Sequence, residues 1–163
     1  MAVSKRLALD TNVLFDRANE ESFAKDFLAV FQRKGFSFEV PPTVIYELDY
    51  FRRKGKGAEQ MAAETALCSV QKWGLTPLIL TDVQRSYKRN FISIAQNANL
   101  LPAKEINDLH ILAETAIADI AALVTSDRPL LDIDRVALPL AFQNAGLPTV
   151  SPVHPRRMLQ ALR

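Results

Sequence analysis

Short apolar runs alternate with longer segments of helical periodicity along most of this chain. Short runs rich in apolar side chains, bounded by polar residues, glycine or proline, are typical of buried strands. They predict strands at residues 6–9, 36–40, 75–80, 120–125 and 148–150. Each predicted strand is separated from the next by at least one segment with a different, helical spacing of apolar residues.

In the helical segments, apolar residues recur every three or four positions. Phe23, Phe27 and Phe31, for example, share one face of a predicted helix that ends before Gly35. The predicted helices cover residues 22–34, 41–53, 58–73, 83–97, the segment after Pro102, 136–144 and 155–162. Strands that alternate with helices form a parallel sheet covered on both faces. We therefore predict an α/β fold, a three-layer α/β/α sandwich with a central parallel sheet of four to five strands.

Composition adds bounds on domain number and location. The 163 residues are 48% hydrophobic, enough for one core, and contain no internal repeat or low-complexity linker, so we expect a single domain over residues 1–163. The apolar stretch near the N-terminus is broken at Asp10, unlike a signal peptide. No apolar run has the length that a membrane span needs. We expect a cytoplasmic protein with no membrane partner.

The residue inventory restricts which metal site the chain can build. A single cysteine excludes an internal disulfide and a cysteine-cage zinc site, and two histidines exclude a histidine-rich site. Any metal site must therefore consist of carboxylates, the ligands of hard cations such as Mg²⁺ or Mn²⁺. The net charge of +2 is too small to identify a nucleic-acid partner by itself.

Two of the predicted strands end in an aspartate, Asp10 and Asp127. A carboxylate at a buried strand end is costly without a partner. If the two strands are neighbours, the carboxylates approach and raise each other's pKa unless a cation lies between them. Taken singly, Asp10 also fits a cap after a strand, and Asp127 fits an ordinary turn.

Two further acids lie on predicted helices. Glu47 borders the apolar face of the helix over residues 41–53, and Asp108 lies in the first turn of the helix after Pro102. Alone, Glu47 fits a partly exposed helix residue, and Asp108 fits a charge that complements the helix dipole. The order and context of all four acids carry the functional interpretation.

Four stretches resemble the PIN-domain nucleases, including the toxin ribonucleases of toxin–antitoxin pairs of the VapC type. They are Leu7–Phe15 with its Asp-Thr-Asn, Val40–Leu48, Asn107–Ala116 and Ala122–Asp127, and the finish from Val150 to Pro152 is also similar. The resemblance covers nearly the whole chain, in order. Residues 55–101 look longer than a minimal toxin needs.

The resemblance implies a metal-dependent endoribonuclease that hydrolyses RNA phosphodiester bonds. Asp10, Glu47, Asp108 and Asp127 would bind Mg²⁺ or Mn²⁺. Asn12 and Thr125 or Ser126 would support these ligands or position water. The implied products carry a 5′ phosphate and a 3′ hydroxyl, and the implied partners are RNA, an antitoxin protein and a second copy of the chain.

Basic residues near two of these acids are candidates for RNA contacts. Arg52, Arg53 and Lys54 follow Glu47 on the same helix, and Arg128 is next to Asp127. Clusters of this kind can hold phosphates. A solvated helix face explains the first cluster equally well, and local charge neutralisation is the alternative for Arg128.

Two other functions compete with this interpretation. A phosphatase with an aspartate nucleophile also begins from a strand-end aspartate, but Asn12 stands where that chemistry usually has a second aspartate. A catalytically silent PIN-like module that binds RNA or protein is the non-enzymatic alternative, and the full set of four acids argues against it. No Gly-rich phosphate loop is present, which argues against nucleoside triphosphate chemistry.

Overall fold

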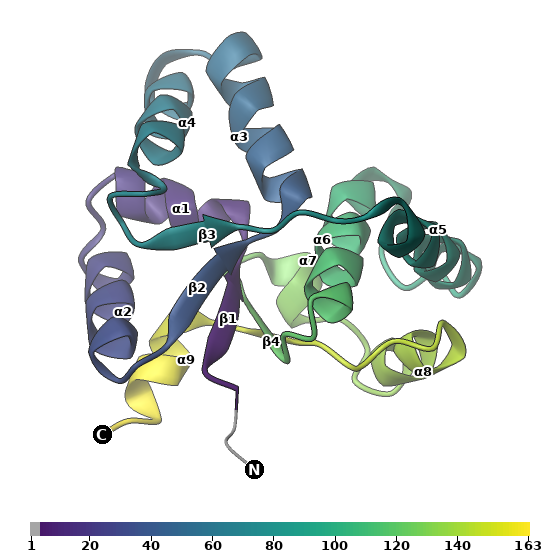
Figure 1. The fold of residues 1–163 in the computed structure, drawn as a ribbon. Coiled ribbons are helices and arrows are strands. Elements are labelled where there is room, and N and C mark those ends of the chain that lie inside the picture. The colour runs from purple at the N-terminus through teal and green to yellow at the C-terminus, as the bar shows by residue number, and fades with distance from the viewer. Residues whose placement is uncertain (1–3) are drawn as a thin grey trace.

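A five-stranded, all-parallel sheet forms the centre of the protein (Figure 1), whose computed structural model describes residues 4–163. The strands are β1 Arg6–Leu9, β2 Ser37–Val40, β3 Leu75–Pro77, β4 Ala122–Val124 and β5 Ser151–Val153, and their order across the sheet is β3-β2-β1-β4-β5. The predicted α/β class with a parallel sheet of four to five strands is confirmed.

The register brings the carboxyl ends of β1 and β4 to the same edge of the sheet. Ala8 pairs with Leu123 and Leu9 with Val124, and the Asp10 backbone N–H donates to the Val124 carbonyl at 3.0 Å. Within the sheet, the Arg6 guanidinium at the start of β1 donates to both oxygens of Glu39 on β2, at 2.6 and 2.7 Å. This pair joins β1 to β2, while the carboxyl edge carries the strand-end aspartates.

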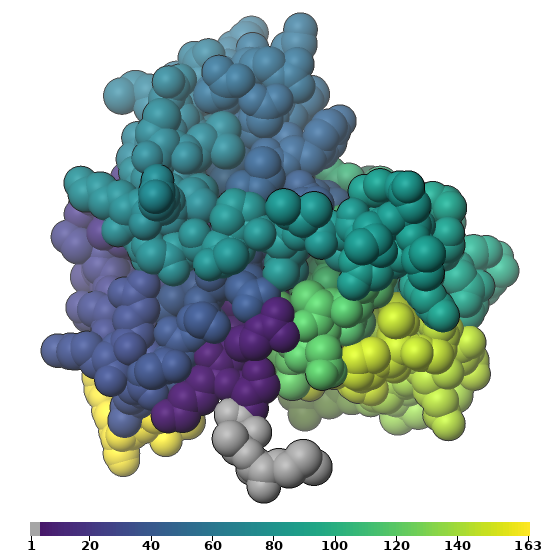
Figure 2. Space-filling model, in the orientation of Figure 1, coloured from purple at the N-terminus to yellow at the C-terminus, as the bar shows by residue number. Residues whose placement is uncertain are grey.

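Helices cover both faces of the sheet (Figure 1). The helices are α1 Thr11–Ala18, α2 Ser22–Arg33, α3 Pro42–Lys54, α4 Gly57–Ser69, α5 Asp82–Asn97, α6 Ile106–Ile117, α7 Arg128–Leu131, α8 Ala137–Asn144 and α9 Pro155–Gln160, with a 3₁₀ turn, η1, at Ala103–Glu105. The paired helices α3 and α4 project at the top of Figure 2. None of the helices within residues 4–163 is long and apolar enough to cross a membrane.

Eight of the twelve residues of α6 are buried, among them Asp108 in its first turn. Leu109, Ile111 and Leu112 of α6 are buried. Next to this helix, Phe91 of α5 and Phe142 of α8 stack with ring centroids 4.6 Å apart. Such packing stabilises by removing apolar surface from water and holds α6 in one position.

Several element boundaries differ from the sequence-based prediction. The helices α1 and α7 were not predicted. The last strand lies at residues 151–153 rather than 148–150, since the Ser151 N–H donates to the Ala121 carbonyl and so sets where pairing begins. The third strand covers residues 75–77 of the predicted 75–80.

Candidate metal centre

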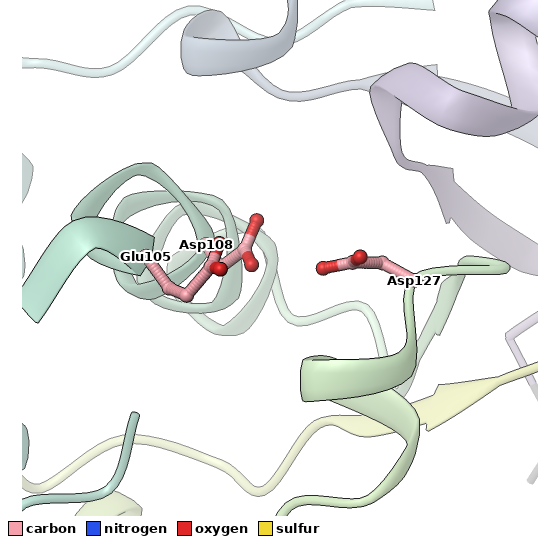
Figure 3. Close-up of side chains that lie close together, drawn as sticks. All are labelled: Glu105, Asp108 and Asp127. Carbon is pink, nitrogen blue, oxygen red and sulfur yellow. The ribbon is translucent and has the colours of Figure 1, made fainter. Parts of the chain in front are cut away.

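Three carboxylates meet near the carboxyl edge of the sheet. Glu105 ends η1, Asp108 lies in the first turn of α6, and Asp127 precedes α7. One oxygen from each lies within 4.8 Å of the others. Figure 3 shows Glu105 and Asp108 extending from one helical segment toward Asp127, which comes from the opposite side. Two separate segments of the chain, one with Glu105 and Asp108 and the other with Asp127, thus contribute to one acidic cluster.

Asp10 lies beside this cluster and is 2% exposed. Its Oδ1 accepts from the Thr11 N–H at 2.7 Å, and its Oδ2 accepts from the Asn12 amide at 2.9 Å and the Thr125 hydroxyl at 2.7 Å. Burial raises the pKa of Asp10 to about 6, against the lowering effect of the bonds from Thr125 and Thr11, and the charges of Glu47 and Asp127 raise it further. The charges of the other acids therefore act directly on Asp10.

The side chains of Asn12, Thr125 and Ser126 connect the ends of β1 and β4. Asn12 Oδ1 accepts from the Ser126 N–H at 2.9 Å and from its hydroxyl at 3.0 Å. Thr125 Oγ1 accepts from the Asp127 N–H at 3.0 Å. These bonds fix the backbone that carries Asp127 relative to Asp10.

Glu47 lies between α1 and the start of α6. Its Oε1 accepts from the Thr11 hydroxyl at 2.6 Å, and its Oε2 accepts from the Asn107 amide at 3.4 Å. Thr11 thus donates to two different acids, with its backbone to Asp10 and with its side chain to Glu47.

A second buried carboxylate anchors the helix that carries Glu47. Glu114 is fully buried and accepts from the Thr43 N–H at 2.9 Å and the Thr43 hydroxyl at 2.7 Å, with Lys88 Nζ at 3.3 Å. Burial raises the pKa of Glu114 despite these partners. Thr43 precedes Glu47 by four residues, one helical turn. The bond from α6 therefore fixes the first turn of α3 and, through it, the position of Glu47.

The acids repel one another strongly in the absence of a cation. Burial, the charge of Asp10 and the adjacent Asp127 raise the pKa of Asp108 to about 9. Within residues 4–163, no lysine, arginine or histidine forms a salt bridge with any of the acids Asp10, Glu47, Glu105, Asp108 and Asp127. The negative charge of the cluster is thus not balanced by basic side chains of the described chain.

The arrangement fits a hard divalent cation. Asp108 Oδ2 is buried and has no hydrogen-bond partner within residues 4–163. A buried polar atom without a partner is costly, and a bound cation would provide one. The available donors are carboxylate oxygens, which Mg²⁺ and Mn²⁺ prefer.

The predicted basic residues are not part of this cluster. Arg52 and Arg53 both pair with Asp49 on their own helix, at 2.7 and 2.9 Å, and Lys54 is exposed. Arg128 pairs with Asp132 at 3.4 Å.

Glu105, Thr11 and Asn107 were not predicted from the sequence as site residues. Glu105 lies in a 3₁₀ turn without apolar periodicity, so only its spacing of three from Asp108 gives a signal. Thr11 and Asn107 each adjoin a predicted acid, which was the available signal for them.

The sheet order and the carboxylates at its carboxyl edge define an α/β protein with an acidic site where the strands end. No protein-family model matches the chain, and no curated protein matches its sequence. Solved structures do match. The crystal structure of VapBC2 from Rickettsia felis, bound to a DNA fragment from their promoter, matches with a TM-score of 0.63 and 18% identity, over 91% of this chain and 98% of that chain.

Two further structures match at similar levels. VapBC-1 from nontypeable Haemophilus influenzae gives a TM-score of 0.56 with 12% identity, over 93% of this chain and 98% of that chain. The structure of FitAB bound to an IR36 DNA fragment gives a TM-score of 0.57 with 14% identity, over 91% of this chain and 94% of that chain. At these identities the likeness concerns the fold, and it confirms the PIN-like fold expected from the sequence resemblance.

These matches also bear on the length of residues 55–101. Less than a tenth of this chain is unaligned with VapBC2, whereas residues 55–101 make up more than a quarter of it. The expectation that residues 55–101 are longer than a minimal toxin needs stays a prediction.

Proposed function

We propose that this protein is a metal-dependent endoribonuclease that hydrolyses RNA phosphodiester bonds. The observation that carries the proposal is the buried, unpartnered Asp108 Oδ2 within a cluster of acids that no basic side chain of residues 4–163 pairs with. Asp10, Glu47, Asp108 and Asp127 would hold one or two Mg²⁺ or Mn²⁺ ions, with Glu105 as an additional ligand.

A bound divalent cation would act as a Lewis acid on the phosphodiester and make water acidic enough to attack at neutral pH. The protein's own groups prepare this site. Three donors hold the Asp10 carboxylate in a fixed orientation, and Asn12, Thr125 and Ser126 hold Asp127 beside it. Asp108 keeps a proton in the metal-free protein because its pKa is raised, and it would release that proton when the site is loaded.

The implied partners follow from the fold neighbours. Those structures are PIN-domain toxin–antitoxin complexes, which supports an antitoxin as a partner of this chain. RNA would be the substrate, with phosphate contacts from Arg52, Arg53, Lys54 and Arg128, and the protein would act in the cytoplasm. A homodimer is the assembly we propose for the isolated chain.

The test uses purified protein with 5′-labelled RNA in Mn²⁺, Mg²⁺ or EDTA. We expect cleavage that needs the metal, leaves a 5′ phosphate, and disappears in Asp10→Asn and Glu47→Gln. Asp26→Asn is the matched control, because Asp26 is exposed and has no hydrogen bond or salt bridge from its side chain within residues 4–163.

Undiminished metal-dependent cleavage by Asp10→Asn would overturn the assignment. RNA binding by the wild type without any cleavage would instead indicate the non-cutting PIN-like module.

A further inference from the structure

A groove of about 1020 Å³ runs along the outer edge of β5. It is bordered by α9 and by the segment from α7 to the start of α8, and β5 is the last strand in the order of the sheet. Typical small-molecule pockets measure about 300–1,000 Å³. The volume of the groove therefore lies at the upper end of this range.

One end of the groove lies beside the candidate metal centre. Ser126 and Arg128, the two residues that flank Asp127, line it. His154 lines the same groove just after the carboxyl end of β5, and Thr149 lines it just before the amino end. Because the strands are parallel, the carboxyl ends of β4 and β5 share one edge of the sheet. The groove thus begins next to the acids and follows β5 away from them.

The charged residues of the groove are mainly cationic. Arg128, Arg135 and Arg157 line it, and Asp132 is the single acid among the lining residues. Asp132 pairs with Arg128 at 3.4 Å. Arg135 and Arg157 have neither a salt bridge nor a hydrogen bond from their side chains within residues 4–163. Two guanidinium groups are therefore available for an anionic ligand.

The remaining lining is largely apolar, with side chains such as Leu131, Ile133 and Met158. Single-stranded nucleic acid presents regularly spaced phosphates on one side and flat apolar base faces on the other. Sites for it combine cationic groups that follow the backbone with apolar or aromatic surfaces under the bases. The mixture of arginines and apolar side chains in this groove matches both parts of such a ligand.

We propose that the groove along β5 binds the single-stranded RNA that extends from the cleavage site, with Arg135 and Arg157 contacting its phosphates. This inference rests on the proposed nuclease function. It adds a path for the substrate that does not include the predicted contacts at the end of α3. The RNA leaves the acids past Arg128 and continues along the edge strand.

The edge strand favours RNA over an acidic peptide as the occupant. The Ser151 N–H donates to β4, and the Val153 carbonyl accepts from β4, so in a parallel strand Pro152 is the residue whose backbone faces outward. Proline has no N–H to donate. A peptide that adds a strand to β5 would lose a ladder hydrogen bond at its centre, whereas RNA needs no such ladder.

The experiment measures the salt dependence of RNA binding in EDTA, where cleavage is absent. The probe is an oligouridylate of about twelve nucleotides, within the range of known single-strand sites. Each phosphate contact contributes about 0.7 to the slope of log K against log salt for single strands. For the double variant Arg135→Ala/Arg157→Ala, we expect the magnitude of this slope to be smaller than that of the wild type by about 1.4. Binding at moderate salt should weaken about threefold for each arginine, as for an exposed ion pair.

Arg33→Ala/Lys72→Ala is the matched control with the same change in charge. Both residues are exposed, neither forms a salt bridge within residues 4–163, and neither lines the groove. We expect its slope to equal that of the wild type. Photo-crosslinking with 4-thiouridine in the oligonucleotide should also label peptides between Thr149 and Met158.

Equal slopes in the two double variants, or crosslinks confined to other segments, would overturn the proposal. An oligomer of aspartate and glutamate that binds with the same arginine dependence, while RNA does not, would assign the groove to a protein partner and also overturn it. If RNA binding depends on the two arginines but the wild type never cleaves RNA, the proposal that the groove binds RNA is supported and only the nuclease function is refuted.

Discussion

Replacing Asp108 by asparagine should stabilise the metal-free protein while destroying the metal site. Asp108 has a pKa of about 9 in the folded protein, against about 4 in an unfolded chain. Because this pKa is raised, the protonated carboxyl group of Asp108 contributes to the free energy of unfolding. This contribution is fully present below pH 4 and is lost as the pH rises toward 9. Asparagine has the same shape, carries no charge, and can donate its amide to Asp127.

The size of the effect follows from the pKa difference. Each pH unit above 4 lowers the free energy of unfolding by about 1.4 kcal/mol, which gives about 4 kcal/mol at pH 7 as an upper bound. Solvent at the mouth of the site screens the charges and reduces this to about 2 kcal/mol. For a chain of this length, that corresponds to a rise of about 4–8 °C in the melting temperature.

The assay is urea unfolding in EDTA at pH 4.5 and pH 7, followed by circular dichroism. We expect Asp108→Asn to match the wild type at pH 4.5 and to exceed it at pH 7, with an unchanged denaturant slope. Adding Mn²⁺ at pH 7 should stabilise the wild type and not the variant. A variant less stable than the wild type at pH 7, or a gain equal at both pH values, would refute the electrostatic reasoning.

Three further predictions concern stability. Because burial raises the pKa of Asp10 from about 4 to about 6, the metal-free wild type should lose melting temperature as the pH rises from about 4 to about 6, and Mg²⁺ should remove most of that loss; a flat profile over this range in EDTA would contradict this. Glu114→Gln should lower the free energy of unfolding by about 2–4 kcal/mol in urea titrations, since the buried bonds from Thr43 and Lys88 are disrupted; an unchanged midpoint would contradict the anchoring role. Phe142→Ala should cost about 3–5 kcal/mol through the cavity beside Phe91, with Mn²⁺ still stabilising the folded variant; loss of the Mn²⁺ effect would mean that the two regions are coupled.

The strand pattern predicted the fold because parallel strands buried on both faces appear as apolar runs. The first strand was predicted at residues 6–9 and is found there. Asp10 and Asp127 were expected to approach because the carboxyl ends of neighbouring parallel strands share an edge, and the charge of Asp127 does act on Asp10. Whether these acids bind metal stays a prediction.

Features that depend on contacts between distant segments could not be predicted from the sequence. The short helix α1 begins where the Asp10 carboxylate accepts from the Thr11 N–H, an orientation that Thr125, far along the chain, also stabilises. The start of β5 depends on pairing with β4 rather than on its own residues. Glu105 joins the cluster only because η1 turns it toward Asp127, and a 3₁₀ turn leaves no periodic signal.

The bond between Glu114 and Thr43 has a consequence for mutational screens of this protein. A screen that scores only loss of function would group Glu114 with the acids of the metal centre. Glu114 instead accepts its hydrogen bonds from Thr43, one helical turn before Glu47. A parallel score of protein abundance would separate the two sets, because the anchoring variant reduces the amount of folded protein and the metal-centre variants do not.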